Sequence, residues 1–337
     1  MKPVWARCAL IAALSILPAA AVLAAPLKVV TSFSILQDMT REIGGPDVEV
    51  QTLVGADGDA HGFEPSAADS RKLAGAGLLV VNGLGFEPWL DRLVQASGFK
   101  GQQVIASEGV KPRAFAQAAG GDHDDDHDHD HDHDHDHDHD HDHDHDHDHD
   151  HGHAHSHGHD HGTQDPHAWQ DLRNGMIYAR NIGRALAQTD PSHAERYRQR
   201  TDAYVAKLQA LQSKAVQTFA AIPEARRKVV STHDAFGYFG DAYGVRFVPV
   251  FGLSTMSEPS AAGFAAVIER VKQEQVPAIF IENIGNSRLA EQIARESGAR
   301  LGGTLYSDAL AKPGQPGATY LGMFEWNVQQ LAAALRP

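Results

Sequence analysis

The segment between the two halves of the chain is Gln164–Asp171, which reads Gln-Asp-Pro-His-Ala-Trp-Gln-Asp. A tract of alternating His and Asp lies immediately before it, and the longest helical pattern of the sequence begins after it. A strict His-Asp alternation has no apolar face to bury, so we expect this insertion, residues 116–163, to be disordered. His167 therefore stands where the insertion meets the folded part of the chain.

The charge of the chain is concentrated in the insertion. Of the 44 acidic side chains 17 lie in residues 122–161, with 19 of the 23 histidines and no Lys or Arg. The net charge of −15 therefore reflects this tract, since the remaining residues hold 27 acidic and 29 basic side chains. Imidazoles and carboxylates at this density predict weak, exchangeable binding of divalent cations. With no basic stripe elsewhere, we expect no binding of nucleic acid.

Residues 1–25 have the pattern of a secretory signal peptide. Lys2 and Arg7 come before the apolar run Ala9–Leu23, and small residues follow at Ala24. The run is short for a membrane span and leads straight into a strand pattern, which favours cleavage and a location in the periplasm. The only cysteine, Cys8, lies in this segment. A metal site in the mature chain must therefore use nitrogen and oxygen ligands.

Strand and helix patterns alternate in both halves, which predicts an α/β protein of two doubly wound parallel-sheet lobes. With 337 residues, the chain is long enough for each lobe to bury its own core. The first lobe is expected over residues 26–190 and the second over residues 221–337. The predicted strands are residues 27–31, 48–54 and 78–81, then 228–232, 245–250, 278–282 and 299–305.

A long helix is predicted between the lobes. Asp190 and Pro191 are a typical helix start, and residues with the spacing of one helix face continue to Ala220. About 30 residues at 1.5 Å each give a rod of roughly 45 Å. We expect this linking helix, residues 191–220, to hold the lobes rigidly at a nearly fixed separation. The predicted core face of this helix is Tyr197, Thr201, Tyr204, Leu208, Leu211, Ala215 and Phe219.

Four histidines lie outside the insertion: His61, His167, His193 and His233. His193 falls on the exposed first turn of the long helix, so we assign it to the surface. His61 and His233 follow predicted strands, as does Asp308, and ligands of open α/β sheets bind beyond the carboxyl ends of strands. Each residue alone has an ordinary explanation: a loop histidine is usually solvated, and an aspartate often caps a helix.

Four motifs, in chain order, resemble the ligand motifs of one family: Asp59–Ser66, Asp165–Trp169, Ser231–Phe239 and Tyr306–Leu310 followed by Thr319–Leu321. This is the family of periplasmic zinc- and manganese-binding proteins of ABC importers (cluster A-I), and the likeness is greatest to its zinc members of the ZnuA and AztC type. The resemblance implies a metal held between the lobes by His61, His167, His233 and Asp308. One departure is Ala60, where several relatives have an acidic residue or proline.

The chemistry of this residue set favours zinc. Three imidazoles and one carboxylate suit a closed tetrahedral Zn²⁺ site, whereas manganese prefers more oxygen. In the family, a glutamate commonly replaces the third histidine in manganese carriers. The second nitrogen of a ligating imidazole needs a partner of its own, and the candidates here are Asp59, Asp165 and Glu282.

We therefore predict a zinc-binding component of an ABC importer, not an enzyme. It would capture Zn²⁺ between its lobes as a monomer and deliver it to a membrane permease, with a periplasmic zinc chaperone as a further candidate partner. Manganese or another divalent metal is the alternative cargo. A zinc-dependent hydrolase is less favoured, because four protein ligands leave no position for water and neither His-Glu-x-x-His nor Gly-x-Ser-x-Gly occurs. A passive metal buffer would not need histidines in the folded body.

Overall fold

The computed structural model describes residues 25–115, 164–250, 260–285 and 287–336. The predicted signal peptide, up to residue 24, and the insertion, residues 116–163, lie outside these ranges. None of the helices in the described ranges is long and apolar enough to cross a membrane.

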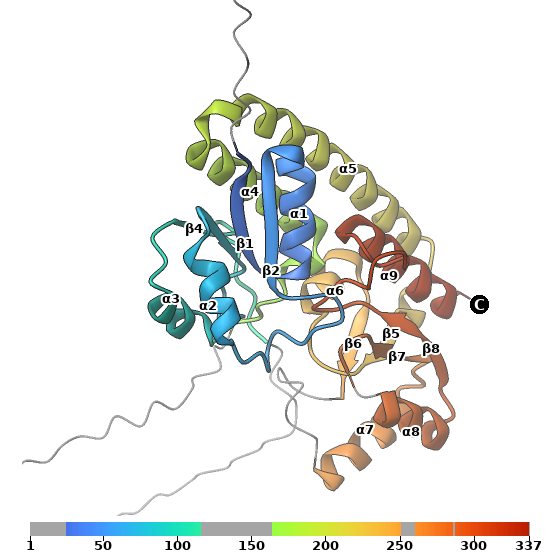
Figure 1. Ribbon diagram of the computed structural model, residues 1–337. Helices are drawn as coiled ribbons and strands as arrows, with labels where there is room; N and C mark the ends of the chain where they lie inside the picture. The colour runs from blue at the N-terminus through green and yellow to red at the C-terminus, as the bar shows by residue number, and fades with distance from the viewer. Residues whose placement is uncertain (1–24, 116–163, 251–259, 286, 337) are drawn as a thin grey trace, which may run out of the picture.

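The first lobe is built on a parallel sheet of four strands in the order β2-β1-β3-β4 (Figure 1). These are β1 (Leu27–Phe33), β2 (Val48–Val54), β3 (Leu78–Val81) and β4 (Gln102–Ile105). They are connected by α1 (Ser34–Gly44), α2 (Ala67–Ala74) and α3 (Leu90–Ser97). The sequence did not predict β4, because this edge strand is largely exposed and lacks the apolar run of a buried strand.

The second lobe repeats this topology, with strands in the order β6-β5-β7-β8. They are β5 (Lys228–Ser231), β6 (Arg246–Pro249), β7 (Ala278–Glu282) and β8 (Arg300–Leu305). The helices are α6 (Gly237–Tyr243), α7 (Ala261–Gln273), α8 (Ser287–Ser297) and α9 (Tyr320–Leu335). In both sheets the strand order changes direction beside the first strand, which opens a crevice at the carboxyl ends of the strands. The predicted two-lobe α/β fold is confirmed.

Two helices lead from the first lobe to the second. α4 (Leu172–Thr189) starts where Asp171 accepts Arg173 N–H as an N-cap, and a short 3-10 turn from Pro191 then leads into α5 (Ala194–Ala220). At 27 residues, α5 is about 40 Å long. It packs against α1 and α4 at one end and against α6 and α9 at the other, as the predicted linking helix should (Figure 1).

One position on the core face of α5 differs from the prediction. Leu211 is only half-buried, and the core position is taken by Gln212. Burial of this amide is possible because its Oε1 accepts a hydrogen bond from the hydroxyl of Tyr243 on α6 (2.5 Å). A pattern of apolar spacing cannot identify a glutamine whose partner lies 31 positions further along the chain.

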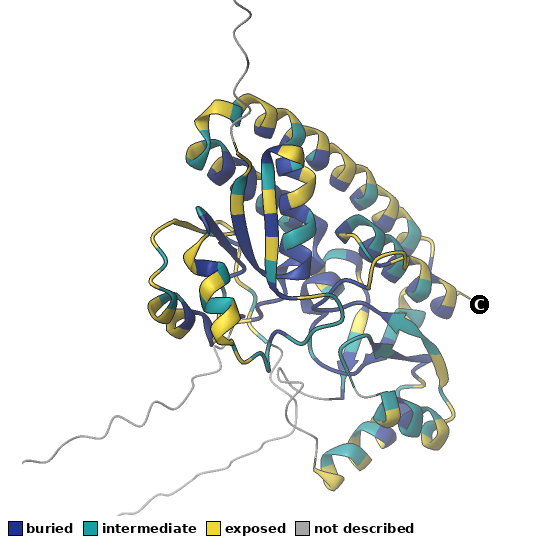
Figure 2. Ribbon diagram, in the orientation of Figure 1, coloured by how far each residue is buried: buried dark blue, intermediate teal, exposed yellow. Residues whose placement is uncertain are grey.

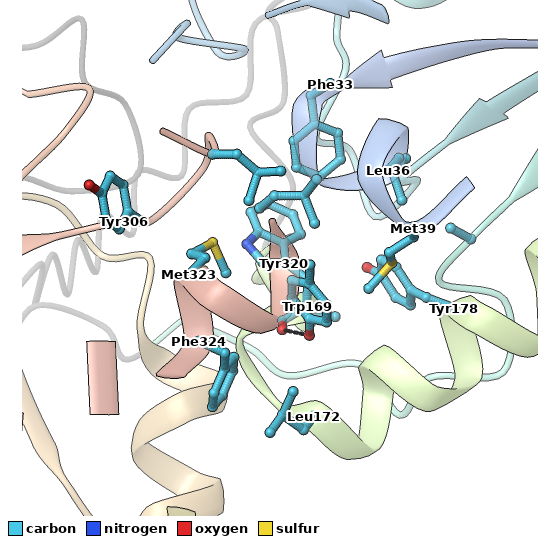
Figure 3. Packing of buried hydrophobic residues seen from close by; sticks show 14 of the residues in the cluster. Phe33, Leu36, Met39, Trp169, Leu172, Tyr178, Tyr306, Tyr320, Met323 and Phe324 are labelled. Carbon is cyan, nitrogen blue, oxygen red and sulfur yellow. Dashed lines mark hydrogen bonds between the residues drawn. The ribbon is translucent and has the colours of Figure 1, made fainter. Parts of the chain in front are cut away.

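The two lobes share a single large core, which differs from the expectation of one core for each lobe. Its buried side chains come from both sheets and from α1, α4, α5, α6 and α9 (Figure 2). At its centre Trp169 packs on Phe33 of β1, with ring centroids 4.9 Å apart, and Tyr320 and Met323 of α9 lie beside it (Figure 3). A smaller cluster lies in the second lobe between its sheet and α7 and α8.

A half-buried carboxylate also joins the lobes. Asp38 on α1 accepts a hydrogen bond from Tyr320 N–H at the start of α9 (2.7 Å). Burial raises the pKa of Asp38 to about 6, although the hydrogen bond from Tyr320 opposes the shift. Ionised Asp38 therefore costs stability at neutral pH.

We predict that Asp38→Asn stabilises the metal-free protein at pH 8 by roughly 1–3 kcal/mol, since one pKa unit is about 1.4 kcal/mol. The folded pKa lies above the ordinary 3.8, so the wild type loses stability as pH rises from about 4 to 6, and the variant does not. Urea unfolding at pH 8 and pH 4 measures both effects. Asp202→Asn, at an exposed position of α5, serves as the control. Equal stabilities of variant and wild type at pH 8 would refute the prediction.

Candidate metal centre

The structure brings the four predicted metal-binding residues together between the lobes. One ligand atom from each lies within 4.8 Å of the other three, in the set His61, His167, His233 and Asp308. The Nε2 atoms of His61 and His233 lie 3.1 and 3.2 Å from Asp308 Oδ2. Nε2 of His167 lies 3.4 Å from Nε2 of His61 and 3.6 Å from Asp308 Oδ1. The ligand atoms of a tetrahedral zinc site lie roughly 3.3–3.6 Å apart, so these spacings suit such an ion.

His61 lies in the loop between β2 and α2, beyond the carboxyl end of β2 as predicted. Two hydrogen bonds hold this loop: Trp89 Nε1–H donates to Ala60 O (2.9 Å), and His61 N–H donates to Asp59 Oδ1 (2.9 Å). Ala60 is fully buried, so a short side chain fits this position. The side chain of His61 is 15% exposed, whereas those of the other three residues are buried. His61 is therefore the member of the set nearest to solvent.

His167 directly precedes the short 3-10 helix Ala168–Gln170 and is fully buried. Its Nδ1 lies 2.8 Å from Asp165 Oδ1, and the same oxygen accepts His167 N–H (3.0 Å). A side chain from the first sheet holds the backbone here, since Asn82 Nδ2–H donates to Pro166 O (2.9 Å). The ring of His167 is thus fixed with Nε2 toward the other three residues.

Asn82 directly precedes a tight turn, in which Phe86 N–H donates to Gly83 O (3.1 Å). Gly83, Leu84 and Gly85 all have positive φ, between 56° and 85°. The turn is held by the buried carboxylate of Glu87, which accepts Asn82 N–H (2.6 Å) and Gly83 N–H (3.1 Å). Burial raises the pKa of Glu87 to about 6 despite these hydrogen bonds. The turn thereby orients the Asn82 side chain that supports the segment of His167.

His233 lies two residues beyond the end of β5 and is buried. Its Nδ1 is 2.6 Å from Glu282 Oε2, on the neighbouring strand β7. The other carboxylate oxygen, Oε1, accepts His233 N–H (2.9 Å) and the hydroxyl of Thr232 (2.6 Å). One buried glutamate therefore holds the backbone of His233 by a hydrogen bond and lies in close contact with its ring.

Asp308 lies beyond β8 in a loop that both lobes hold. The carbonyl of Ser307 accepts hydrogen bonds from Trp169 Nε1 (2.9 Å) and Gln170 Nε2 (2.8 Å). Asn327 on α9 bonds to both N–H and C=O of Tyr306. Among the residues that the structure describes, Asp308 Oδ1 is buried and has no hydrogen-bond partner. A bound cation would satisfy this oxygen.

The charges of the site favour a cation. Burial alone would raise the pKa of Asp308 and lower those of His167 and His233. The opposite charges outweigh burial: Asp308 and Asp165 raise the pKa of His167 to about 9, and Glu282 and Asp308 raise that of His233. The two imidazoles in turn hold the pKa of Asp308 well below its ordinary value. Three buried carboxylates thus create a negative field at the four ligand atoms.

Comparison with known proteins identifies the family. Residues 29–334 match the ZnuA family, described as zinc-uptake complex component A periplasmic. The chain belongs to this family. ZnuA-family proteins are metal-binding components of ABC importers; they act outside the cytoplasm with a membrane permease as partner, and they are not enzymes.

Relatives and solved structures agree with this assignment. The chain is 30% identical to the metal-transporter lipoprotein FimA of Streptococcus parasanguinis and 29% identical to the manganese-transporter lipoprotein PsaA of Streptococcus pneumoniae. Each match covers 92% of this chain and 89% of the relative. Among solved structures, the periplasmic zinc-binding protein TroA of Treponema pallidum is 25% identical with a TM-score of 0.75, over 93% of this chain and 100% of TroA. A manganese-bound periplasmic protein of Candidatus Liberibacter asiaticus is also 25% identical, with a TM-score of 0.73, over 92% and 99%.

Two of the three predicted imidazole partners are confirmed as contacts. Asp165 and Glu282 lie at Nδ1 of His167 and His233. Asp59 accepts the backbone N–H groups of His61 and Gly62. His193, which the sequence assigns to the surface, lies apart from this ZnuA-family site, with Nδ1 2.5 Å from Asp190 Oδ2 at the start of α5.

Sequence reasoning missed the polar residues that support the ZnuA-family site from a distance. None of Asn82, Asn327 and Arg113 was identified as a support of the site. Asn327 stands in an otherwise apolar stretch of α9, a signal that could have marked it, because a buried amide needs a specific partner. Arg113 carries no local signal, since its partners lie 52 and 128 positions further along the chain.

We predict that Glu282→Ala destabilises the metal-free protein by about 2–4 kcal/mol, because it leaves buried donors of Thr232 and His233 without their acceptor. Glu282→Gln, which keeps one acceptor oxygen, should cost less. Urea unfolding in a chelator measures both. Glu296→Ala, at an exposed position of α8, should stay within about 0.5 kcal/mol of the wild type. A loss below about 1 kcal/mol for Glu282→Ala would show that Glu282 does not support the site.

Proposed function

We propose that the protein is the periplasmic zinc-binding component of an ABC importer. It would bind Zn²⁺ through Nε2 of His61, His167 and His233 and a carboxylate oxygen of Asp308, then deliver it to the membrane permease. The observation that carries the proposal is the convergence of these residues in a largely buried position between the lobes: one ligand atom from each lies within 4.8 Å of the others, and the Nε2 atoms of His61 and His233 lie 3.1 and 3.2 Å from Asp308 Oδ2.

The choice of zinc rests on the donor set. Three imidazole nitrogens and one carboxylate are a typical set for tetrahedral Zn²⁺, whereas Mn²⁺ prefers more oxygen ligands at larger coordination numbers. The relatives do not decide the metal, because PsaA belongs to a manganese transporter and TroA is a zinc-binding protein. The ligand chemistry of this chain supports zinc over manganese, the alternative cargo.

The buried carboxylates beside the rings of His167 and His233 would support zinc binding. A ligating imidazole must present a lone pair at Nε2, which requires its proton on Nδ1. Asp165 and Glu282 lie at the Nδ1 atoms of His167 and His233 and would hold the proton there. The same contacts fix the rings before the metal arrives, so little side-chain entropy is lost on binding.

We predict that the protein without residues 122–161 binds one zinc ion tightly, since the four proposed ligands lie outside that segment. In this background, His233→Ala should weaken binding roughly 100-fold or more, because it removes one of four ligands. His193→Ala should leave the affinity within about twofold. Competitive titration against a zinc chelator gives both values. Equal effects of the two substitutions, or loss of tight binding on deletion of the segment, would contradict the proposed ligand set.

A second experiment tests the cargo. With equimolar Zn²⁺ and Mn²⁺ offered to the metal-free protein, we expect zinc in the site after gel filtration, measured by elemental analysis. His233→Glu, which adds a second carboxylate, should reduce the preference for zinc over manganese. Retention of manganese by the wild type would favour the alternative cargo.

A further inference from the structure

The two ends of the insertion come together beside the metal centre. Ala114 and Gln164 form an antiparallel bridge, and Asp165 N–H donates to Arg113 O (2.7 Å). The chain therefore leaves and re-enters the folded body at one place, next to the segment that carries His167. Arg113 is the last residue before this bridge and belongs to the first lobe.

The guanidinium of Arg113 connects this place to the second lobe. Nη1 donates to Asp165 Oδ2 (3.2 Å), and Nε donates to Asp241 Oδ2 on α6 (2.8 Å). The backbone of Arg113 adds a further contact, because its N–H donates to the hydroxyl of Tyr238, also on α6 (3.0 Å). Arg113 thus binds a carboxylate of each lobe.

The two oxygens of the Asp165 carboxylate have different partners. Oδ1 accepts His167 N–H and lies at Nδ1 of the same residue, whereas Oδ2 accepts the hydrogen bond from Arg113. Since Asp165 is fully buried, loss of Arg113 would leave Oδ2 as an uncompensated charge. The orientation of the Asp165 carboxylate relative to the His167 ring therefore depends on Arg113.

The packing around Arg113 is close. A Cβ added at Gly237, the first residue of α6, would lie 2.2 Å from Arg113 Nη1 and 2.6 Å from Asp165 Oδ2. Glycine therefore allows α6 to approach the Arg113–Asp165 pair. Helix α6, which carries Asp241, is thus in direct contact with Arg113 and Asp165, the pair that holds His167.

We propose that Arg113 is a positioning residue that couples His167 to α6 of the second lobe and so slows release of the bound metal. The chain of contacts runs from Asp241 through Arg113 and Asp165 to His167. Whichever segment opens first, complete release must break the bond between the metal and His167, and a ring held in place by these contacts recaptures the metal more readily. The inference rests on the proposed metal-binding function and adds to it a residue that touches no metal.

The test is the rate of zinc release into excess chelator, followed by stopped flow. Asp241→Asn should speed release about two- to fivefold, because Asp241 is 66% exposed and such ion pairs are weak. Arg113→Ala should speed it roughly tenfold or more, as loss of the support of a ligating imidazole does. Combining both substitutions should release zinc no faster than Arg113→Ala alone, because the two act through one chain of contacts.

The control is Glu325→Gln, which breaks the similarly exposed ion pair of Glu325 with Lys214 between α9 and α5. Its release rate should equal that of the wild type. Gly237→Ala should speed release without removing any charge, which separates positioning from electrostatics. Urea unfolding of each metal-free variant shows whether a change in rate follows a change in stability.

Two results would overturn the inference. One is an unchanged release rate for Asp241→Asn and Gly237→Ala; the other is additive effects of Arg113→Ala and Asp241→Asn. Failure of the proposed function looks different, because the wild-type protein would then hold no zinc tightly and no release could be measured. Tight zinc binding by the wild type, with unchanged release in the variants, would refute only the coupling.

Discussion

The geometry of the candidate metal centre depends on the pair of hydrogen bonds that Trp169 and Gln170 donate to the carbonyl of Ser307. They join the segment of His167 to the loop of Asp308, although the two segments lie about 140 positions apart in the chain. Each bond contributes only about 1 kcal/mol, but a buried carbonyl without partners would cost more. The indole of Trp169 also fills the core between the lobes, so packing and the geometry of the site are determined by the same side chain.

The shared core limits how the site can open. Separating the lobes would expose Trp169, Tyr320 and Phe324, at about 1.5–3 kcal/mol for each large apolar side chain. The long helix α5 adds to this constraint because it packs on both lobes. Moving the loop that carries His61 away from the site would cost far less free energy, since the His61 side chain is already partly exposed. The structure therefore favours local loop movement over a wide separation of the lobes.

Local patterns explain why much of the fold was predictable. The residues of β2, β3 and β7 follow from short apolar or alternating runs, and the start of the linking helix follows from Asp190 and Pro191, all signals within a few positions. The convergence of His61, His233 and Asp308 follows from one topological rule, since residues beyond the carboxyl ends of parallel strands share a crevice. Gln212, Asn82 and Arg113 could not be recognised in this way. Their partners are distant in sequence, and a buried polar group is understood only from its partner.

The bridge between Ala114 and Gln164 makes the architecture of the folded residues independent of the length of the His-Asp tract. Because Ala114 and Gln164 pair with each other, the folded residues on either side keep their places whatever the length of the sequence between them. The number of His and Asp residues in the tract can thus change in evolution without altering the spacing of the four proposed ligands.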